Sequence, residues 1–153
     1  REFEILKFRS MVTDAEKYGA MMATTHDPRI TKVGRVIRPT RIDELPQILN
    51  ILKGDMSIVG PRPLLVKYLP RYTETQRRRH DVRPGLTGYA QINGRNAISW
   101  EERFAYDVEY VDHITFLGDL KIIWDSVMVA FVRRDGISSE TSVTMEEFMG
   151  NES

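Results

Sequence analysis

The chain has 153 residues, with 22 basic and 22 acidic side chains, and its formal net charge is zero. This length fits one domain, residues 1–153, and a hydrophobic fraction of 41% is enough to build a core. The lack of cysteine excludes disulfides, thiolate metal sites and cysteine nucleophiles. Because the net charge is zero, the chain exerts no long-range attraction on nucleic acid, and we expect no nucleic-acid partner.

The first predicted elements are a short strand and a helix. Alternation of apolar and polar side chains over residues 3–7 predicts the strand. Residues 27–31 predict a turn into a helix in which Val33, Val36 and Ile37 face inward. Pro39 ends this helix, because proline restricts the preceding residue to extended geometry.

The next predicted helix has an apolar stripe with two acidic residues at its start. Thr40 is a candidate N-cap, Pro46 is tolerated only in a first turn, and Gly54 is a natural C-cap. Asp43 and Glu44 therefore lie at a helix N-terminus. The stripe consists of Ile42, Leu45, Ile48, Leu49 and Leu52.

The rest of the chain predicts short elements followed by two longer helices. The fold class that follows is α+β, a mostly helical single domain with a few short strands and a small hairpin. Ser99 and Glu102 form a capping box that starts the first of the two longer helices. The other expected elements are a strand at 57–59, helices at 64–72 and 74–79 interrupted at Pro70, a hairpin strand at 87–93 with its turn at Asn93-Gly94, and a last helix at about 119–134.

Asp43 and Glu44 are the strongest candidates for chemistry. Adjacent acidic residues at a helix N-terminus commonly do no more than complement the helix dipole. Here Arg38 and Arg62 flank the pair, and each of them adjoins proline, which limits its backbone freedom. Arginine binds phosphate oxygens bidentately. The pattern therefore favours a phosphate site over two solvated arginines.

Five segments in sequence order carry a family resemblance: residues 7–11, 43–47, 52–63, 82–88 and 91–96. They resemble the bacterial sugar transferases, the monotopic polyprenyl-phosphate phosphoglycosyl transferases, and most of all the small PglC-like members. The resemblance implies transfer of a phosphosugar from a UDP-sugar to polyprenyl phosphate through a covalent aspartyl-phosphosugar, with release of UMP. It also implies the start of membrane glycoconjugate synthesis at the cytoplasmic face of the bacterial inner membrane.

The resemblance also assigns roles to single residues. Asp43 becomes the nucleophile, Glu44 the ligand of an Mg²⁺ cofactor, and Lys7 a contact of the diphosphate. Arg38 and Arg62 then hold the phosphate charge. Members of this family carry a hydrophobic re-entrant helix before these segments, and we expect the chain to be the catalytic domain without that helix, truncated or engineered to be soluble.

Residues 83–96 leave two interpretations open. They form either a hairpin with turn glycines or a nucleotide pocket, in which Tyr89 stacks on a base while Gln91 and Arg95 bind uracil, ribose or phosphate. Asp107, near the inward face of its helix, is a further candidate for the substrate or metal site. A structural ion pair explains Asp107 equally well.

Membrane contact and two rival functions also remain open. The basic run Arg77-Arg78-Arg79 is either a solvated face or a contact with lipid headgroups. The last helix, with Trp124 and a basic end, is either a core helix or an interfacial one. The rivals are a soluble metal-dependent phosphohydrolase and a non-catalytic membrane-surface module. The oligomeric state is not predicted.

Overall fold

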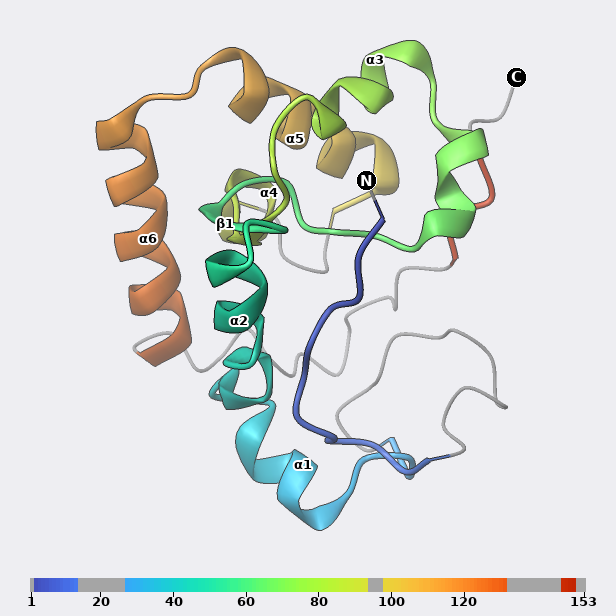
Figure 1. Cartoon of the computed structure of the whole chain (residues 1–153), viewed down its shortest axis with the longest axis vertical. Coiled ribbons are helices and arrows are strands. Elements are labelled where there is room, and N and C mark those ends of the chain that lie inside the picture. Colours follow the sequence, from blue (N-terminus) through green and yellow to red (C-terminus); the bar gives the residue numbers. More distant parts are fainter. Residues whose placement is uncertain (1, 14–26, 94–97, 132–146, 151–153) are drawn as a thin grey trace.

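A computed structural model describes residues 2–13, 27–93, 98–131 and 147–150, without the side chains of 130 and 131. Helices dominate these ranges, and one pair of short strands lies among them (Figure 1). The expected α+β class is confirmed.

The elements follow the capping signals of the sequence. Thr31, Thr73 and Ser99 each accept a hydrogen bond from the backbone N–H three residues later, which caps α1, α3 and α5. The expected capping box at Ser99 is present. In chain order the elements are α1 (Lys32–Ile37), the 3-10 turn η2 (Ile42–Glu44), α2 (Gln47–Leu52), β1 (Ser57–Val59), the 3-10 helix η3 (Val66–Arg71), α3 (Glu74–Arg77), the 3-10 turn η4 (Arg78–His80), β2 (Gly85–Thr87), α4 (Tyr89–Asn93), α5 (Trp100–Asp112) and α6 (Phe116–Phe131).

The two strands β1 and β2 pair in parallel, with Ser57 opposite Gly85 and Val59 opposite Thr87. A side chain at Gly85 would collide with the backbone of the neighbouring strand, so glycine is required for this close approach. Helix α6 packs against both strands and against α4. The expected strand at 57–59 is confirmed.

The expected hairpin is wrong up to Asn93. Residues 89–93 form helix α4 directly after β2, and the next residues, 94–97, lie outside the described ranges. The alternation over 87–93 is too short to distinguish a strand from one helical turn. Helix α6 begins at Phe116, earlier than expected, because Thr115 Oγ1 accepts a hydrogen bond from Gly118 N.

The N-terminal segment forms no strand over residues 3–7, contrary to expectation. It runs beside α2 (Figure 1), where a side chain takes the place of a neighbouring strand. Leu6 N donates to Asn50 Oδ1 at 3.1 Å, and Asn50 Nδ2 donates to Glu4 O at 2.8 Å.

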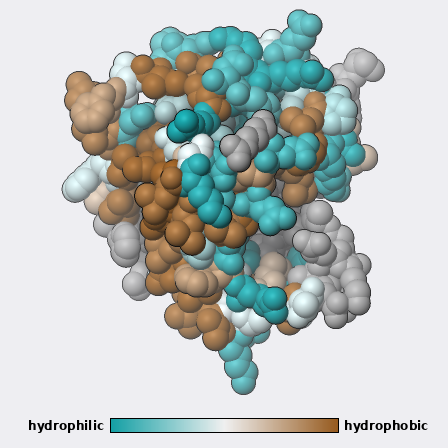
Figure 2. Space-filling view, viewed as in Figure 1, coloured by the Kyte–Doolittle hydropathy of each residue, from teal (hydrophilic) through white to brown (hydrophobic). Residues whose placement is uncertain are grey.

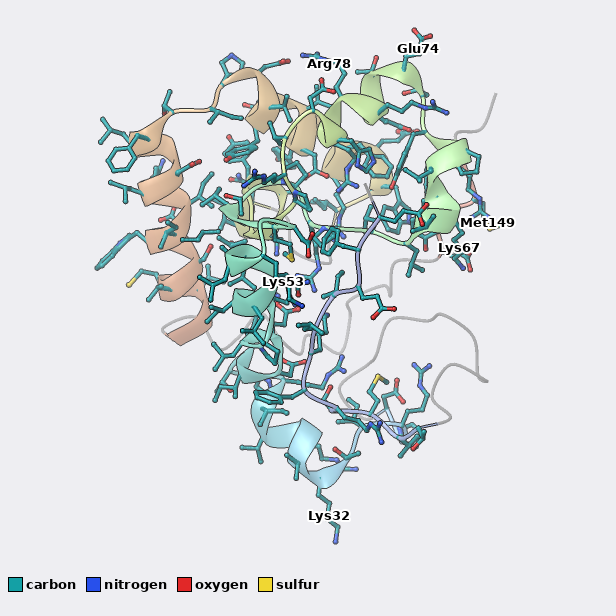
Figure 3. All side chains as sticks on the ribbon, in the orientation of Figure 1. Lys32, Lys53, Lys67, Glu74, Arg78 and Met149 are labelled. Atoms are coloured by element: carbon teal, nitrogen blue, oxygen red, sulfur yellow. The ribbon has the colours of Figure 1, made fainter. Side chains whose placement is uncertain are left out.

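Two groups of buried side chains form the core. An aromatic group contains Tyr68, Tyr72, Phe104 and Phe148, and a second group contains Val59, Tyr110 and Ile122. Lys67 lies beside the segment 147–150 (Figure 3) and pairs with Glu147 at 2.7 Å. The aromatic group thus joins residues near the end of the chain to η3 and α5.

Many apolar side chains of α1, η2, α2 and α6 lie exposed. The expectation that Val33 and Val36 face inward is wrong, because they are 63% and 69% exposed. On α2 the apolar stripe faces out while the polar Gln47 and Asn50 are buried. Figure 2 shows hydrophobic surface on the side where Figure 1 has α2 and α6. We call the following set the apolar band: Val33, Val36, Ile42, Leu45, Ile48, Leu49, Leu52, Phe116, Leu117, Leu120, Trp124, Val127 and Met128.

Across the described ranges, none of the helices has the length and apolar character needed to cross a bilayer.

Candidate active site

Glu44 is the centre of the candidate site. Its carboxylate is nearly buried at the end of η2, and basic side chains from three segments reach it. Arg62 Nη2 lies 2.6 Å and Lys7 Nζ 3.3 Å from Oε1, while Arg41 Nη1 lies 3.3 Å from Oε2. The site therefore gathers three cations around one carboxylate.

Arg41 adopts a strained backbone conformation next to this carboxylate. Its φ of 56° lies in the left-handed region, where non-glycine residues are uncommon. Such strain costs on the order of 1–3 kcal/mol and clusters at functional sites. Here it turns the chain sharply between α1 and η2, so that Asp43 and Glu44 follow directly after the turn.

The two carboxylates have opposite electrostatic environments. Burial alone would raise the pKa of Glu44, but Arg62, Arg41 and Lys7 outweigh it and lower the pKa to about 2. Burial and the adjacent charge of Glu44 raise the pKa of Asp43, although Arg38 and Lys7 oppose this. Glu44 is therefore a fixed negative charge, and Asp43 is the more basic oxygen of the pair.

Asp43 is a buried residue of η2 and bonds the N-terminal segment. Its carbonyl accepts a hydrogen bond from Phe8 N at 2.9 Å. Among the residues that the structure describes, no lysine or arginine forms an ion pair with its carboxylate. The Asp43 carboxylate is therefore not neutralised by a direct contact, as the Glu44 carboxylate is.

Arg38 and Lys7 both act electrostatically on Asp43. Arg38 lies at the C-terminal end of α1, and its Nη1 donates to Ser10 Oγ at 3.2 Å. The pKa of Lys7 is lowered by burial and by the positive charge of Arg62, against the opposing effect of Glu44. Ser10 is itself buried and accepts Thr31 N through its carbonyl, which holds the segment against α1.

Arg62 is held in place by a buried ion pair behind it. Arg79 donates to Asp107 Oδ2 from Nε at 2.9 Å and from Nη2 at 2.7 Å, and Nη2 also donates to the carbonyl of Arg62 at 2.7 Å. Burial raises the pKa of Asp107, and Arg79 opposes the shift. Of the two interpretations of Asp107, the structure therefore contains the ion pair, and a substrate role for Asp107 stays a prediction.

The interpretation of the basic run 77–79 as an exposed face is wrong for Arg79. Its side chain is 1% exposed, because α3 and η4 turn it toward α5. Arg78 remains at the surface and pairs with Asp112.

The candidates for a nucleotide pocket lie on or after α4. Tyr89 packs edge-on against Tyr106 with ring centres 5.6 Å apart, beside the second core group. Gln91 Nε2 donates to Leu86 O at 3.3 Å, while its Oε1 is buried without a partner in the described part of the chain. Arg95 lies outside the described residues. Base or phosphate binding by these three stays a prediction.

Sequence reasoning missed Arg41, Ser10, Asn50 and Arg79. Only Arg41 had a local signal, because it lies two residues before Asp43 and three residues after Arg38. The others act through contacts between segments far apart in the chain, such as the 44 residues between Leu6 and Asn50.

The site has donor atoms suited to Mg²⁺. The ion prefers oxygen ligands and commonly takes one or two protein carboxylates together with substrate phosphates and waters. Asp43 and Glu44 supply two adjacent carboxylates, so their chemistry fits the ion. Within the described ranges no group of three acidic or histidine side chains forms a complete metal cage.

Comparison with known proteins gives consistent matches over this chain. Residues 1–133 match the family described as bacterial sugar transferase. An uncharacterized sugar transferase EpsL of Bacillus subtilis (strain 168) is 53% identical over 151 residues, which cover 99% of this chain and 73% of that protein.

Two further relatives carry named activities. The UDP-glucose:undecaprenyl-phosphate glucose-1-phosphate transferase of Escherichia coli (strain K12) is 41% identical over 142 residues. The undecaprenyl-phosphate galactose phosphotransferase of Salmonella typhimurium is 39% identical over 149 residues. Each match covers 88% of this chain but 31% of the relative. With the match over residues 1–133 and more than half of its residues shared with the Bacillus protein, the chain belongs to the bacterial sugar transferase family.

Proposed function

We propose that the chain transfers a sugar phosphate from a UDP-sugar to polyprenyl phosphate and releases UMP. The activities named for the relatives support the reaction class. The observation that carries the proposal is the convergence of Lys7, Arg41 and Arg62 on Glu44, directly beside the more basic Asp43. Such a site attracts a diphosphate and offers it a nucleophile.

In the first step, a carboxylate oxygen of Asp43 attacks the β-phosphorus of the UDP-sugar. A bond forms between this oxygen and phosphorus, while the bond from phosphorus to the bridging oxygen breaks. The bridging oxygen keeps the electron pair and leaves with UMP. The sugar phosphate remains attached to Asp43 as an acyl phosphate, a known form of covalent catalysis.

The basic side chains stabilise the charge that develops on the phosphate oxygens. Arg62 and Lys7 are already fixed near Glu44, so little reorganisation is needed when the diphosphate binds. Arg38, next to Ser10, adds a third cation on the side of Asp43. The Glu44 carboxylate is a suitable ligand for Mg²⁺, and the ion when bound supplies further positive charge to the substrate phosphates.

In the second step, a phosphate oxygen of polyprenyl phosphate attacks the phosphorus of the Asp43 adduct. The acyl-phosphate bond breaks and its electron pair returns to the Asp43 carboxylate. The product is a polyprenyl diphosphosugar, and the enzyme returns to its starting state without a redox change or an added proton carrier.

The apolar band supports a membrane surface as the second partner. A polyprenyl chain is confined to the bilayer, and the exposed side chains of α2 and α6 offer apolar area for contact with it. A position at the cytoplasmic face of the bacterial inner membrane follows from the proposed substrates, since nucleotide sugars are cytoplasmic metabolites.

Intact-mass spectrometry tests the proposal directly. The chain is incubated with Mg²⁺ and a panel of UDP-sugars, and UMP is measured in parallel. We expect a mass increase of one sugar phosphate with equimolar UMP, and loss of this adduct when a short polyprenyl phosphate is added. The matched control is Asp43→Asn, which keeps the size of the side chain but lacks the nucleophile.

The two rival functions give different results. A phosphohydrolase would release UMP continuously without a lipid acceptor, and its product would be free sugar phosphate. A non-catalytic module would release no UMP with any sugar. Either result overturns the proposed transfer.

A further inference from the structure

Asn50 is a buried polar residue in the middle of a helix whose apolar side chains face outward. It is 2% exposed, and both polar atoms of its side chain bond the backbone of the N-terminal segment. Its Oδ1 accepts Leu6 N at 3.1 Å, and its Nδ2 donates to Glu4 O at 2.8 Å. The side-chain amide thus bonds both the backbone carbonyl of Glu4 and the backbone N–H of Leu6, as an adjacent strand would.

The position of Asn50 is itself fixed by the end of α2. Its carbonyl accepts hydrogen bonds from Asp55 N at 2.9 Å and Met56 N at 3.3 Å, in the turn that leads to β1. Gly54 allows this turn with a φ of 80°. The side-chain amide is therefore held by the framework of the fold.

Lys7 lies between two anchored backbone groups. Leu6 N is held by Asn50, and Phe8 N is held by the carbonyl of Asp43 at 2.9 Å. The backbone of Lys7 can shift little while both bonds persist. Its Nζ then reaches Glu44 Oε1 at 3.3 Å even though its side chain is 41% exposed.

We propose that Asn50 is a positioning residue that places Lys7 at the phosphate site. This inference rests on the proposed function, since it concerns the cation that meets the diphosphate. Asn50 does not contact the reacting atoms and acts through the backbone of residues 4–6. A group displaced by about 1 Å can cost on the order of 100-fold in rate, so a backbone anchor of this kind affects catalysis strongly.

The first experiment measures position without any assay of activity. Native-state hydrogen exchange by NMR compares the wild-type chain with Asn50→Ala, with Ile122→Ala as a control that weakens the core away from the N-terminal segment. In Asn50→Ala we expect the Leu6 amide to lose its protection, while α5 amides keep theirs. In Ile122→Ala the Leu6 amide should exchange no faster than the reduced global stability of that variant accounts for. Unchanged protection of Leu6 in Asn50→Ala overturns the proposal.

If Asn50→Ala does not fold, Asn50→Ser keeps one hydrogen-bonding group and serves in the same comparison.

The second experiment is a double-mutant cycle on the rate of UMP release. Asn50→Ala and Lys7→Met are measured alone and together, at a temperature where all variants are folded. If Asn50 acts through Lys7, the double variant is slower than the worse single variant by no more than about threefold. Effects that multiply show that the two residues act independently, and the proposal is then wrong.

The two experiments separate the inference from the function on which it rests. If the wild-type chain forms no adduct and releases no UMP, while Leu6 loses protection in Asn50→Ala, the anchor is present but the proposed function fails. If the wild-type chain is active and Leu6 is unaffected, the function stands and the positioning role fails.

Discussion

Glu44 holds three cations in place before any substrate arrives. Lys7 comes from the N-terminal segment, Arg41 from the turn before η2, and Arg62 from the loop after β1. The diphosphate of the proposed substrate, bound beside Glu44, would meet these side chains close to the positions in which they are already held. The acidic residue thus organises cations that would otherwise repel one another.

The nucleophile can be tested by one conservative change. Asp43→Asn should lower UMP release on the order of a thousandfold or more, because the amide cannot attack phosphorus. Thermal unfolding should show a folded protein. A covalent sugar-phosphate adduct on Asp43→Asn would show that another residue is the nucleophile.

The ion pairs of Glu44 predict how stability depends on pH. The folded-state pKa of Glu44 is about 2 and its ordinary value is 4.5, so its ion pairs stabilise the fold fully above pH 4.5. This contribution, on the order of 3 kcal/mol, is lost as the pH falls from 4.5 toward 2. Urea unfolding should therefore show a difference between the wild type and Glu44→Gln that shrinks over this range. A constant difference would mean that the three cations do not stabilise the charged form.

Among the elements, α2 is an amphipathic helix whose polar face is buried and whose apolar face is exposed. Polar Gln47 and Asn50 lie buried, Asn50 against the N-terminal segment, and apolar Leu49 and Leu52 face outward. The buried face bonds a segment of backbone, which needs polar partners rather than hydrocarbon. This arrangement positions the acidic pair in η2, shortly before α2, and leaves the apolar stripe free for another surface.

The link between α5 and η4 is predicted to depend on both members of its ion pair. Asp107→Asn leaves Arg79 buried without a counterion and should lower the free energy of unfolding by about 3–5 kcal/mol. Replacing both, as Arg79→Met with Asp107→Leu, should cost less because no charge stays unpaired. Chemical denaturation of the three variants measures this. A double variant as unstable as Asp107→Asn would contradict the argument.

At the scale of the whole molecule, the apolar band is the main candidate for membrane contact. It includes Trp124 and Leu117 on α6, which are 64% and 75% exposed. Arg79 is withdrawn into the interior and Arg78 pairs with Asp112, so the basic run offers less charge to lipid headgroups than the sequence suggested. Contact through the band should therefore be mainly apolar.

Vesicle sedimentation tests this contact. The chain should bind vesicles reversibly, with an affinity that changes little between low and high salt, because apolar contact is not screened. Leu117→Glu should weaken binding severalfold. The control Thr75→Glu places the same charge at an exposed position on α3 and should leave binding unchanged. Equal loss in both variants would indicate charge repulsion instead of apolar contact.

The family, the fold class and the candidate acidic pair with its flanking basic residues could all be predicted from the sequence. These features are local: a capping box needs residues three apart, and Asp43, Glu44 and Arg38 lie within one short segment. The strand at 57–59 and the helix after Ser99 follow from the same short-range rules.

Local patterns did not predict which helix faces are buried or which contacts hold the candidate site in place. The apolar positions of α1 and α2 face outward, Arg79 lies inside, and residues 89–93 are helical, all contrary to local patterns. Periodicity shows that a helix has two faces but not what each face meets. The hydrogen bonds between Leu6 and Asn50 and between Arg79 and Arg62 join residues 44 and 17 positions apart, and such contacts exist only after the chain has folded.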